Sequence, residues 1–187
     1  MNVILLGPPG CGKTTQAEIL ARRVGLLTIA TGDLLSRAVQ GDTELGREAK
    51  GFMDRKEMVP DELIFRLIKQ QVGSPEAAQG VVLDGFPRTN RQAQTVDRIL
   101  AGREERVNSV LLFDVPEEEL VRRQLASAPD GERSDETIQA IKHRVGAYRK
   151  STAPLILHYR ELAVLAIVPG TGTVEEVAEA VKKEVGD

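Results

Sequence analysis

Residues 1–15 read MNVILLGPPGCGKTT, and this stretch decides the fold. Residues 1–6 carry no charge, which predicts a buried β-strand. The turn that follows has the spacing of a Walker A motif, with Gly7, Gly12, Lys13 and Thr14 as its defining residues. In this motif successive backbone N–H groups face one cluster of phosphate oxygens, an approach that a Cβ atom would block.

A helix is expected directly after the turn, because apolar residues recur at helical spacing over residues 16–24. Its N-terminus would lie beneath the anion and add a partial positive charge to that of Lys13. The alternative is a glycine-rich turn that only joins a strand to a helix. The complete strand, loop and helix pattern favours a phosphate site.

Length and composition limit the class of protein. At 187 residues the chain suits one core with short insertions rather than two ordinary domains. A net charge of -3 and 3% aromatic residues argue against nucleic acid as a partner. No apolar run reaches membrane-spanning length, and residues 1–6 lead into a strand rather than a cleavable leader. We therefore expect a cytoplasmic protein with no membrane partner.

The single cysteine, Cys11, excludes an internal disulfide. It lies inside the phosphate loop, where the helix terminus could lower the pKa of its thiol and make it reactive. A small filler residue is the favoured interpretation.

Four further apolar runs occupy residues 26–30, 81–84, 109–115 and 163–168. They are continuous rather than alternating, and helical patterns separate them, which is typical of a parallel sheet covered on both faces. The sequence therefore predicts an α/β fold with a doubly wound, five-stranded parallel sheet. The helices expected within residues 31–60 are too polar for a buried layer and predict an insertion beside the site.

Polar residues follow two of these strands, where ligands of parallel sheets collect. Thr31 and Asp33 come after residues 26–30. Asp84 ends the next run in the Walker B form, in which a carboxylate orients the hydration shell of Mg²⁺. Asp84 as a helix cap and Arg88 as a surface charge are the alternatives. The strand-end position of both residues favours function.

Arginines at separate places supply more positive charge than one nucleoside triphosphate requires, namely Arg88, Arg123, Arg133 and Arg144. Guanidinium groups bind phosphate through paired hydrogen bonds, so a second phosphate-bearing substrate would explain them. A phosphate acceptor needs no general base, and His143 and His158 are interpreted as structural or exposed residues. Residues 31–60 and 127–134 are the candidates for segments that close over the substrates and exclude water.

Along nearly its whole length the chain resembles bacterial adenylate kinases of the short-lid type. The resemblance rests on residues 7–16, Thr31-Gly32-Asp33, residues 84–89 with Gln92, and residues 133–144. It implies a P-loop sheet of order 2-3-1-4-5, in which residues 31–60 form the AMP-binding segment. Residues 127–134 would form a lid that is too short for a zinc-bearing insertion.

The same resemblance implies roles for individual residues. The ATP-binding residues would be Gly10, Cys11, Gly12, Lys13, Thr14, Thr15, Arg123 and Gly170. The AMP-binding residues would be Thr31, Arg37, Met53, Val59, Gly85, Arg88 and Gln92. The catalytic residues would be Lys13, Asp84, Arg88, Arg133 and Arg144. Asp84 would hold Mg²⁺ through water, Asp33 and Asp135 would be supporting carboxylates, and Gln92 with Thr31 would read adenine.

The chain departs from the family pattern at three places. Thr14 replaces a glycine and brings the hydroxyl with which other P-loop proteins ligate Mg²⁺. Ser36 replaces an arginine for the AMP phosphate, and we expect the neighbouring Arg37 to reach in its stead. Ala126 and Ser127 stand in the place of a lid arginine. Either Arg122 compensates for the missing arginine, or this enzyme turns over more slowly than its relatives.

The expected activity is reversible transfer of a phosphoryl group from ATP to AMP, giving two ADP, with Mg²⁺ as cofactor and a monomer as the working unit. One alternative keeps the chemistry but takes UMP, CMP or another monophosphate, although UMP/CMP kinases usually carry Asn at the position of Gln92. Another is a P-loop regulatory or binding protein with low turnover.

Overall fold

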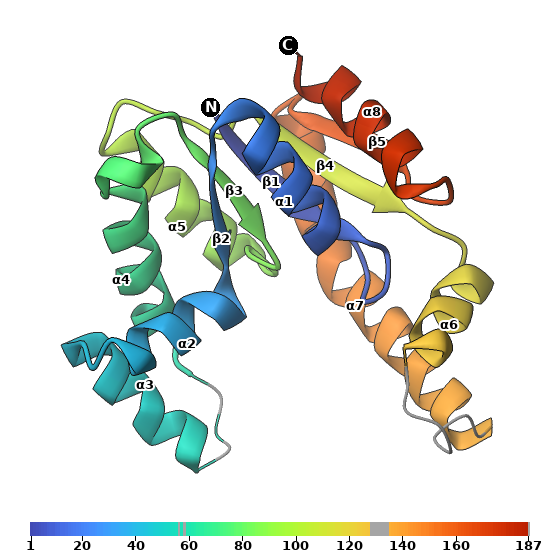
Figure 1. Ribbon diagram of the computed structural model, residues 1–187, viewed down its shortest axis with the longest axis horizontal. Helices are drawn as coiled ribbons and strands as arrows, with labels where there is room; N and C mark the ends of the chain where they lie inside the picture. The colour runs from blue at the N-terminus through green and yellow to red at the C-terminus, as the bar shows by residue number, and fades with distance from the viewer. Residues whose placement is uncertain (56, 58, 128–134, 187) are drawn as a thin grey trace.

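The computed structural model describes residues 1–55, 57, 59–127 and 135–186, without the side chains of Asp135 and Glu136. Within these ranges five parallel strands form one sheet in the order β2-β3-β1-β4-β5 (Figure 1). The strands are β1 Asn2–Leu6, β2 Leu27–Ala30, β3 Val81–Asp84, β4 Ser109–Asp114 and β5 Leu165–Pro169. The doubly wound parallel sheet and its order are therefore confirmed.

Two strands begin later than the apolar runs predicted. Leu26 donates its N–H to the carbonyl of Ala21 and so closes the preceding helix instead of opening β2. Ala163 has a φ of 55°, a left-handed conformation that does not fit an extended strand, so β5 begins at Leu165. Leu26 is buried, so its apolar character does not separate it from the strand, whereas Ala163 is exposed in the turn before β5.

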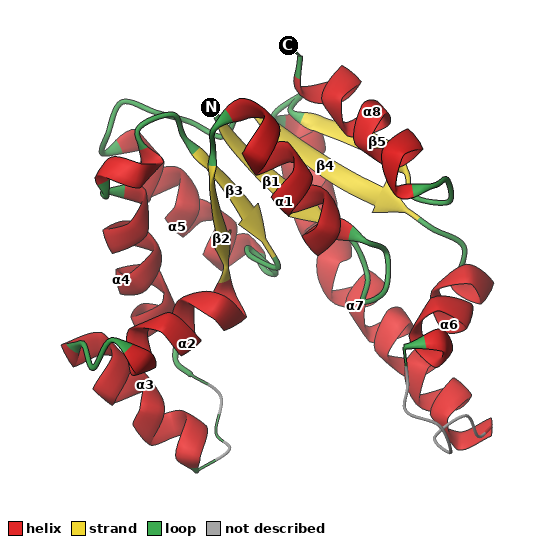
Figure 2. Ribbon diagram, viewed as in Figure 1, coloured by secondary structure: helices red, strands yellow, loops and turns green. Residues whose placement is uncertain are grey.

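Helices cover both faces of the sheet, as the continuous apolar strands require (Figure 2). Val3 and Leu5 of β1 pack in one cluster with α1 Lys13–Val24 and α8 Val174–Val185. Ile4 and Leu6, which alternate with them, pack in the other. The helices of that second face are α4 Asp61–Val72, α5 Asn90–Ala101 and the long α7 Asp135–Glu161, which continues through Pro154.

A helical insertion follows β2 at the carboxyl edge of the sheet (Figure 1). It consists of α2 Thr31–Gln40 and α3 Glu44–Asp54. The sequence predicted this insertion correctly. The prediction that its helices stay out of the buried layer was wrong in part. Leu34 and Ala38, on the inner side of α2, belong to the core cluster that α4 and α5 share.

The remaining helices complete the chain. The 3₁₀ helix η1 Pro75–Ala77 precedes β3, and α6 Glu117–Ala126 follows β4. Of the expected lid segment, only Ser127 lies within the described residues. None of the described helices has the length and apolar composition needed to cross a lipid bilayer.

Candidate functional site

The loop between β1 and α1 has the geometry of a phosphate cradle. Gly10 and Gly12 have φ of 86° and 91°, left-handed values that side chains disfavour. A Cβ atom at Gly7 would collide with the Sγ of Cys11. Gly12 is the N-cap of α1 and offers no side-chain oxygen to the N–H groups of the first turn. These N–H groups and the half-buried Lys13 make an anion site.

The buried position of Cys11 explains its role in this loop. Its side chain is 2% exposed, and burial raises the pKa of its thiol despite the nearby Lys13. A protonated, inaccessible thiol is a poor nucleophile. The structure therefore supports the filler interpretation.

Thr14 and Asp84 meet beside the cradle. The hydroxyl of Thr14 donates a hydrogen bond of 2.6 Å to Oδ2 of Asp84, which ends β3 and is 5% exposed. The other oxygen, Oδ1, is buried and accepts no hydrogen bond from any described residue. A buried carboxylate oxygen without a partner is costly, and a hydrated cation would satisfy it.

The residues expected at the AMP site gather at the ends of β2 and β3. A Cβ atom at Gly85 would lie 3.9 Å from Oγ1 of Thr31 and 3.5 Å from Nη2 of Arg88. Nε of Arg88 donates to the carbonyl of Gly85 at 2.8 Å. The backbone N–H of Arg88 donates to Oε1 of Gln92 at 2.7 Å. The structure thus brings Thr31, Gly85, Arg88 and Gln92 together.

A small cavity of about 80 Å³ joins the two halves of the site. The phosphate loop contributes Pro9 and Lys13, while Gly85 and Arg88 line it from the β3 side. Tyr148 of α7 lines the same cavity. The positively charged side chains of Lys13 and Arg88 therefore line one cavity, and a ligand bound between them would contact both.

Sequence reasoning missed Tyr148, because it falls on the apolar stripe of the long helix with Ile141 and Val145. Burial raises the pKa of its hydroxyl, so the group stays protonated and can donate a hydrogen bond. The feature of the sequence that could have identified Tyr148 is its polar hydroxyl in a stripe that is otherwise aliphatic.

Arg123 connects α6, the phosphate loop and the turn before α8. Its Nη2 donates to the carbonyl of Gly170 at 2.8 Å and its Nη1 to that of Cys11 at 3.4 Å. Its Nε donates to Glu119 at 2.6 Å. A Cβ atom at Gly170 would lie 2.5 Å from Cγ2 of Val115, so the backbone approaches closely there.

The proposed substitute for the missing lid arginine is engaged elsewhere. Arg122 donates two hydrogen bonds of 2.7 Å to Glu119 from the outer side of α6. Hydrogen bonds from Arg122 and Arg123 lower the pKa of Glu119 to about 2. Arg122 would have to leave this carboxylate to reach a nucleotide.

Other expected residues lie apart from the cavity. Arg37 is exposed on α2, and the hydroxyl of Ser36 donates to the carbonyl of Gly32 in its own helix. Met53 is 43% exposed at the end of α3, and Val59 is half-buried. The structure does not join Arg37, Met53 or Val59 to the phosphate loop.

The expectations for the lid and α7 have separate outcomes. Arg133 lies outside the described residues, as does the side chain of Asp135. Arg144 is exposed on α7, one turn before Tyr148 and so on the same side of that helix.

Neither histidine reaches the cavity. His158 contacts Asp97 at 3.4 Å and packs edge-on against Tyr159, while His143 is exposed. This agrees with their structural interpretation.

Comparison with known proteins gives a consistent family. A family model described as adenylate kinase matches residues 5–164. Several relatives carry the same name, and three of them illustrate the similarity. The one from Nocardia farcinica is 42% identical over 186 residues, covering 100% of this chain and 99% of the relative. The one from Thermobifida fusca is 41% identical over 179 residues, covering 96% and 95%. The one from Clostridium acetobutylicum is 36% identical, covering 100% of both. With a phosphate cradle and a second cationic site meeting over one sheet edge, the chain belongs to the adenylate kinase family.

Proposed function

We propose that the chain catalyses the reversible, Mg²⁺-dependent transfer of the γ-phosphoryl group of ATP to AMP, which gives two ADP. The observation that carries this function is the cavity that Lys13 and Arg88 line together. One cation belongs to the phosphate loop and the other to the segment after β3. If the phosphates of two nucleotides meet there, Lys13 can bind one of them and Arg88 the other.

On the ATP side, the backbone N–H groups of residues 10–15 surround the β- and γ-phosphates. Lys13 neutralises charge on these two groups as the transfer proceeds. The adenine lies against Arg123 and Gly170, whose contact fixes the guanidinium plane on which a base can stack. Binding ATP therefore uses groups that are already held in place.

On the AMP side, Arg88 binds the phosphate while Thr31 and Gln92 read the base. Gly85 allows the nucleotide to approach the backbone closely because it has no Cβ atom, and its φ of 75° also disfavours larger residues. Arg37, Met53 and Val59 complete the site when residues 31–60 close over the nucleotide. This closure brings in residues that lie apart from the cavity here.

The residues at the end of β3 fit a magnesium ion. Asp84 would hold it through water, since its Oδ1 has no partner among the described residues, and Thr14 would ligate it directly. When bound, Mg²⁺ would neutralise the negative charge that develops on the phosphate oxygens.

The chemistry needs orientation and charge more than proton transfer. The attacking group is an oxygen of the AMP phosphate, which is already anionic, so no general base is required. Lys13 and Arg88 offset the repulsion between the two polyanions. Arg133 and Arg144 stabilise the transferring group, and residues 31–60 and 127–134 exclude the water that would compete for it.

The proposed activity can be tested by running the reaction in reverse, from ADP. Purified protein with Mg²⁺ and ADP alone should form ATP and AMP in equal amounts, measured by separation of the nucleotides. A panel of acceptors with ATP then tests AMP against CMP and UMP. ATP binding without ADP disproportionation would support the low-turnover binding protein instead. The monomer and the cytoplasmic location stay predictions, for light scattering and cell fractionation to check.

A further inference from the structure

The N-terminal ends of α4 and α5 meet through a hydrogen bond that no sequence motif predicted. Nε2 of Gln92 donates to Oδ1 of Asp61 at 2.7 Å, across 31 residues of sequence. Oε1 of the same Gln92 accepts from the backbone N–H of Arg88 at 2.7 Å. Both ends of the Gln92 amide are therefore fixed by neighbours.

These two neighbours determine which way the amide points. A backbone N–H can only donate, and an ionised carboxylate can only accept. If the amide rotated by half a turn, its NH₂ group would face the N–H of Arg88 and its oxygen would face Asp61. Both hydrogen bonds would then become contacts between groups of the same kind, so the observed orientation is the favourable one.

The ordinary role of an acidic residue in this place is to stabilise its own helix. Asp61 is the first residue of α4, where a negative charge complements the helix dipole. The N-cap of α4, Pro60, makes no side-chain hydrogen bond, and the Asp61 carboxylate accepts its hydrogen bond from Gln92 of α5. Glu62 supplies a second acid in the same turn. The bond to Gln92 is a contact that helix stabilisation does not require.

We infer that Asp61 is a specificity-determining residue, which orients Gln92 so that the site selects a base with an amino group. This inference rests on the proposed role of Gln92 in reading the acceptor base. Arg88 occupies one lone pair of Oε1 of Gln92, and Asp61 occupies one N–H of its Nε2. The amide therefore keeps one lone pair and one N–H for a ligand. Adenine complements them, because its amino group donates and the adjacent ring nitrogen accepts.

The same orientation rejects a base with an oxygen in that place. IMP differs from AMP in having a carbonyl instead of the amino group, with a protonated ring nitrogen beside it. Its acceptor would face Oε1 and its donor would face Nε2 of Gln92, leaving polar groups unpaired. Cytosine carries an amino group beside a ring acceptor and uracil does not. The orientation therefore excludes UMP by hydrogen bonding, whereas it leaves CMP to be rejected by its smaller size.

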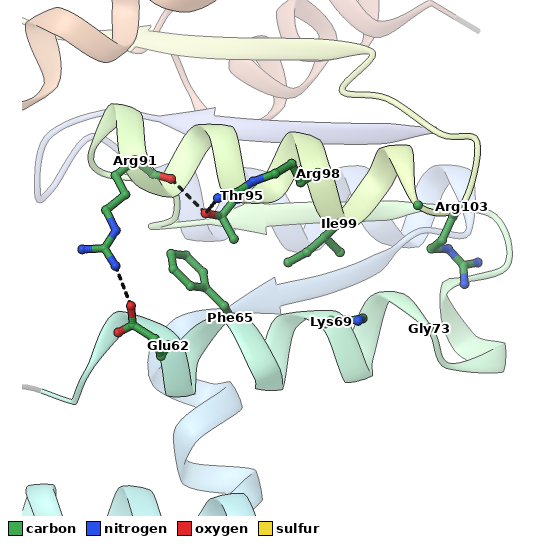
Figure 3. A pocket seen from close by; sticks show the side chains of 10 residues that line it. Glu62, Phe65, Lys69, Gly73, Arg91, Thr95, Arg98, Ile99 and Arg103 are labelled. Atoms are coloured by element: carbon green, nitrogen blue, oxygen red, sulfur yellow. Dashed lines mark hydrogen bonds and ion pairs between the residues drawn. The ribbon is translucent and has the colours of Figure 1, made fainter.

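The experiment compares AMP with IMP in Asp61→Asn and in a matched control. An asparagine can donate as well as accept, so it removes one of the two penalties for a rotated Gln92. The control is Glu62→Gln, which removes one charge from the same helical turn. Glu62 forms an ion pair with Arg91 at 2.5 Å across the groove of about 540 Å³ between α4 and α5 (Figure 3).

The expected readout is the ratio of kcat/KM for AMP to that for IMP, with ATP as donor. We expect Asp61→Asn to lower this ratio about tenfold, the effect of one hydrogen bond to a charged group. Glu62→Gln should leave it unchanged. If Asp61→Asn lowers both kcat/KM values by the same factor, Asp61 only holds α4 to α5 and the inference is wrong.

A second measurement needs no variant. In the unsubstituted enzyme, each amino-bearing base should be preferred over its oxo counterpart of the same ring size, AMP over IMP and CMP over UMP. UMP turnover equal to or above that of CMP would overturn the inference. A protein that phosphorylates none of the four fails the proposed function instead, because the role of Asp61 concerns only the choice among accepted bases.

Discussion

At the scale of single residues, Glu119 shows how one carboxylate can position two arginines. It accepts hydrogen bonds from Nε of Arg122 and from Nε of Arg123, at 2.7 and 2.6 Å. Arg123 in turn holds the carbonyls of the phosphate loop and of the turn before α8. The charge of Glu119 therefore matters for stability as well as for the position of Arg123 beside the phosphate loop.

The pH dependence of this cluster is predictable in sign. Hydrogen bonds from the two arginines lower the pKa of Glu119 from 4.5 to about 2. A lowered pKa means that the ionised form stabilises the fold above about pH 4.5, and that this contribution is lost as the pH falls toward 2. We expect Glu119→Gln to be less stable than the parent near neutral pH, with the difference shrinking as the pH falls through this window.

Urea denaturation at several pH values measures this difference. Glu118→Gln is the matched control, since it removes a charge from the same first turn of α6. A stability difference for Glu119→Gln that stayed constant from neutral pH to pH 2 would contradict the assignment of the effect to ionised Glu119.

Thr14 gives a second prediction at this scale. Replacing it with valine keeps the branched shape but removes the hydroxyl that lies 2.6 Å from Asp84. We expect the affinity for Mg²⁺ in the presence of ADP to fall about tenfold, the loss typical for a group beside a metal site. Calorimetric titration of the nucleotide-loaded protein with Mg²⁺ measures it. Thr14→Ser, which keeps the hydroxyl, should bind Mg²⁺ like the parent, and equal affinities in all three proteins would exclude direct ligation.

At the scale of elements, the packing of α2 against α3 depends on one glycine. Thr43 caps α3 by accepting a hydrogen bond of 3.0 Å from the N–H of Gly46. A Cβ atom at Gly46 would overlap the backbone of Ala38 in α2. The two helices approach this closely only because that position has no side chain.

Gly46→Ala should therefore separate the helices of the insertion. We expect a loss of about 2 kcal/mol in the free energy of unfolding, typical of overpacking, and a higher KM for AMP with ATP binding unchanged. Thermal denaturation and steady-state kinetics with each substrate varied provide the measurement.

Gly51→Ala is the control within the same helix. A Cβ atom there meets only Nη1 of Arg55, at an ordinary distance of 3.5 Å. This variant should gain up to about 1 kcal/mol, because alanine favours helix more than glycine. Destabilisation of both variants by the same amount would show that the packing at Ala38 is not the cause.

At the scale of the whole molecule, the site lies between two parts of the chain. The helical insertion after β2 stands on one side of the carboxyl edge, and α6 with the first turns of α7 stands on the other (Figure 1). Lys13 and Arg88 line the cavity between the central strands. A ligand that reaches across this edge would bind the native chain through both halves of the site.

A bisubstrate mimic, two adenosines joined through a phosphate chain, tests this arrangement. At about a hundred times its Kd it should stabilise the native state by about 2.7 kcal/mol, which raises Tm by roughly 5–10 °C for a chain of this size. Scanning calorimetry with the mimic, with ATP alone and with AMP alone makes the comparison. Each nucleotide at the concentration of the mimic should give a smaller shift. A mimic no better than ATP would mean that the second half of the site is not engaged.

Much of the fold could be predicted because its signals are local. The strands are apolar runs, the helices have apolar residues at helical spacing, and the phosphate loop needs glycines at fixed places. The errors have local causes too. Leu26 closes a helix and Ala163 turns left-handed, details of backbone conformation that apolar character does not reveal.

The candidate site could be predicted only in part. Lys13, Asp84 and Arg88 follow from motifs, because each stands at a strand end within a few residues of a recognisable signal. Tyr148 and Asp61 carry no such signal, since a tyrosine on an apolar stripe and an acid at a helix start both have ordinary structural readings.

The sequence by itself determined the phosphate loop, the alternation of strands and helices, and the family to which the chain is similar. The tertiary structure decided which distant side chains meet. Thr14 bonds Asp84 across 70 residues, Arg123 bonds Gly170 across 47, and Gln92 bonds Asp61 across 31. Such contacts depend on strand order, register and the placement of helices over the sheet, and no local pattern encodes these because the interacting groups become neighbours only when the core is packed.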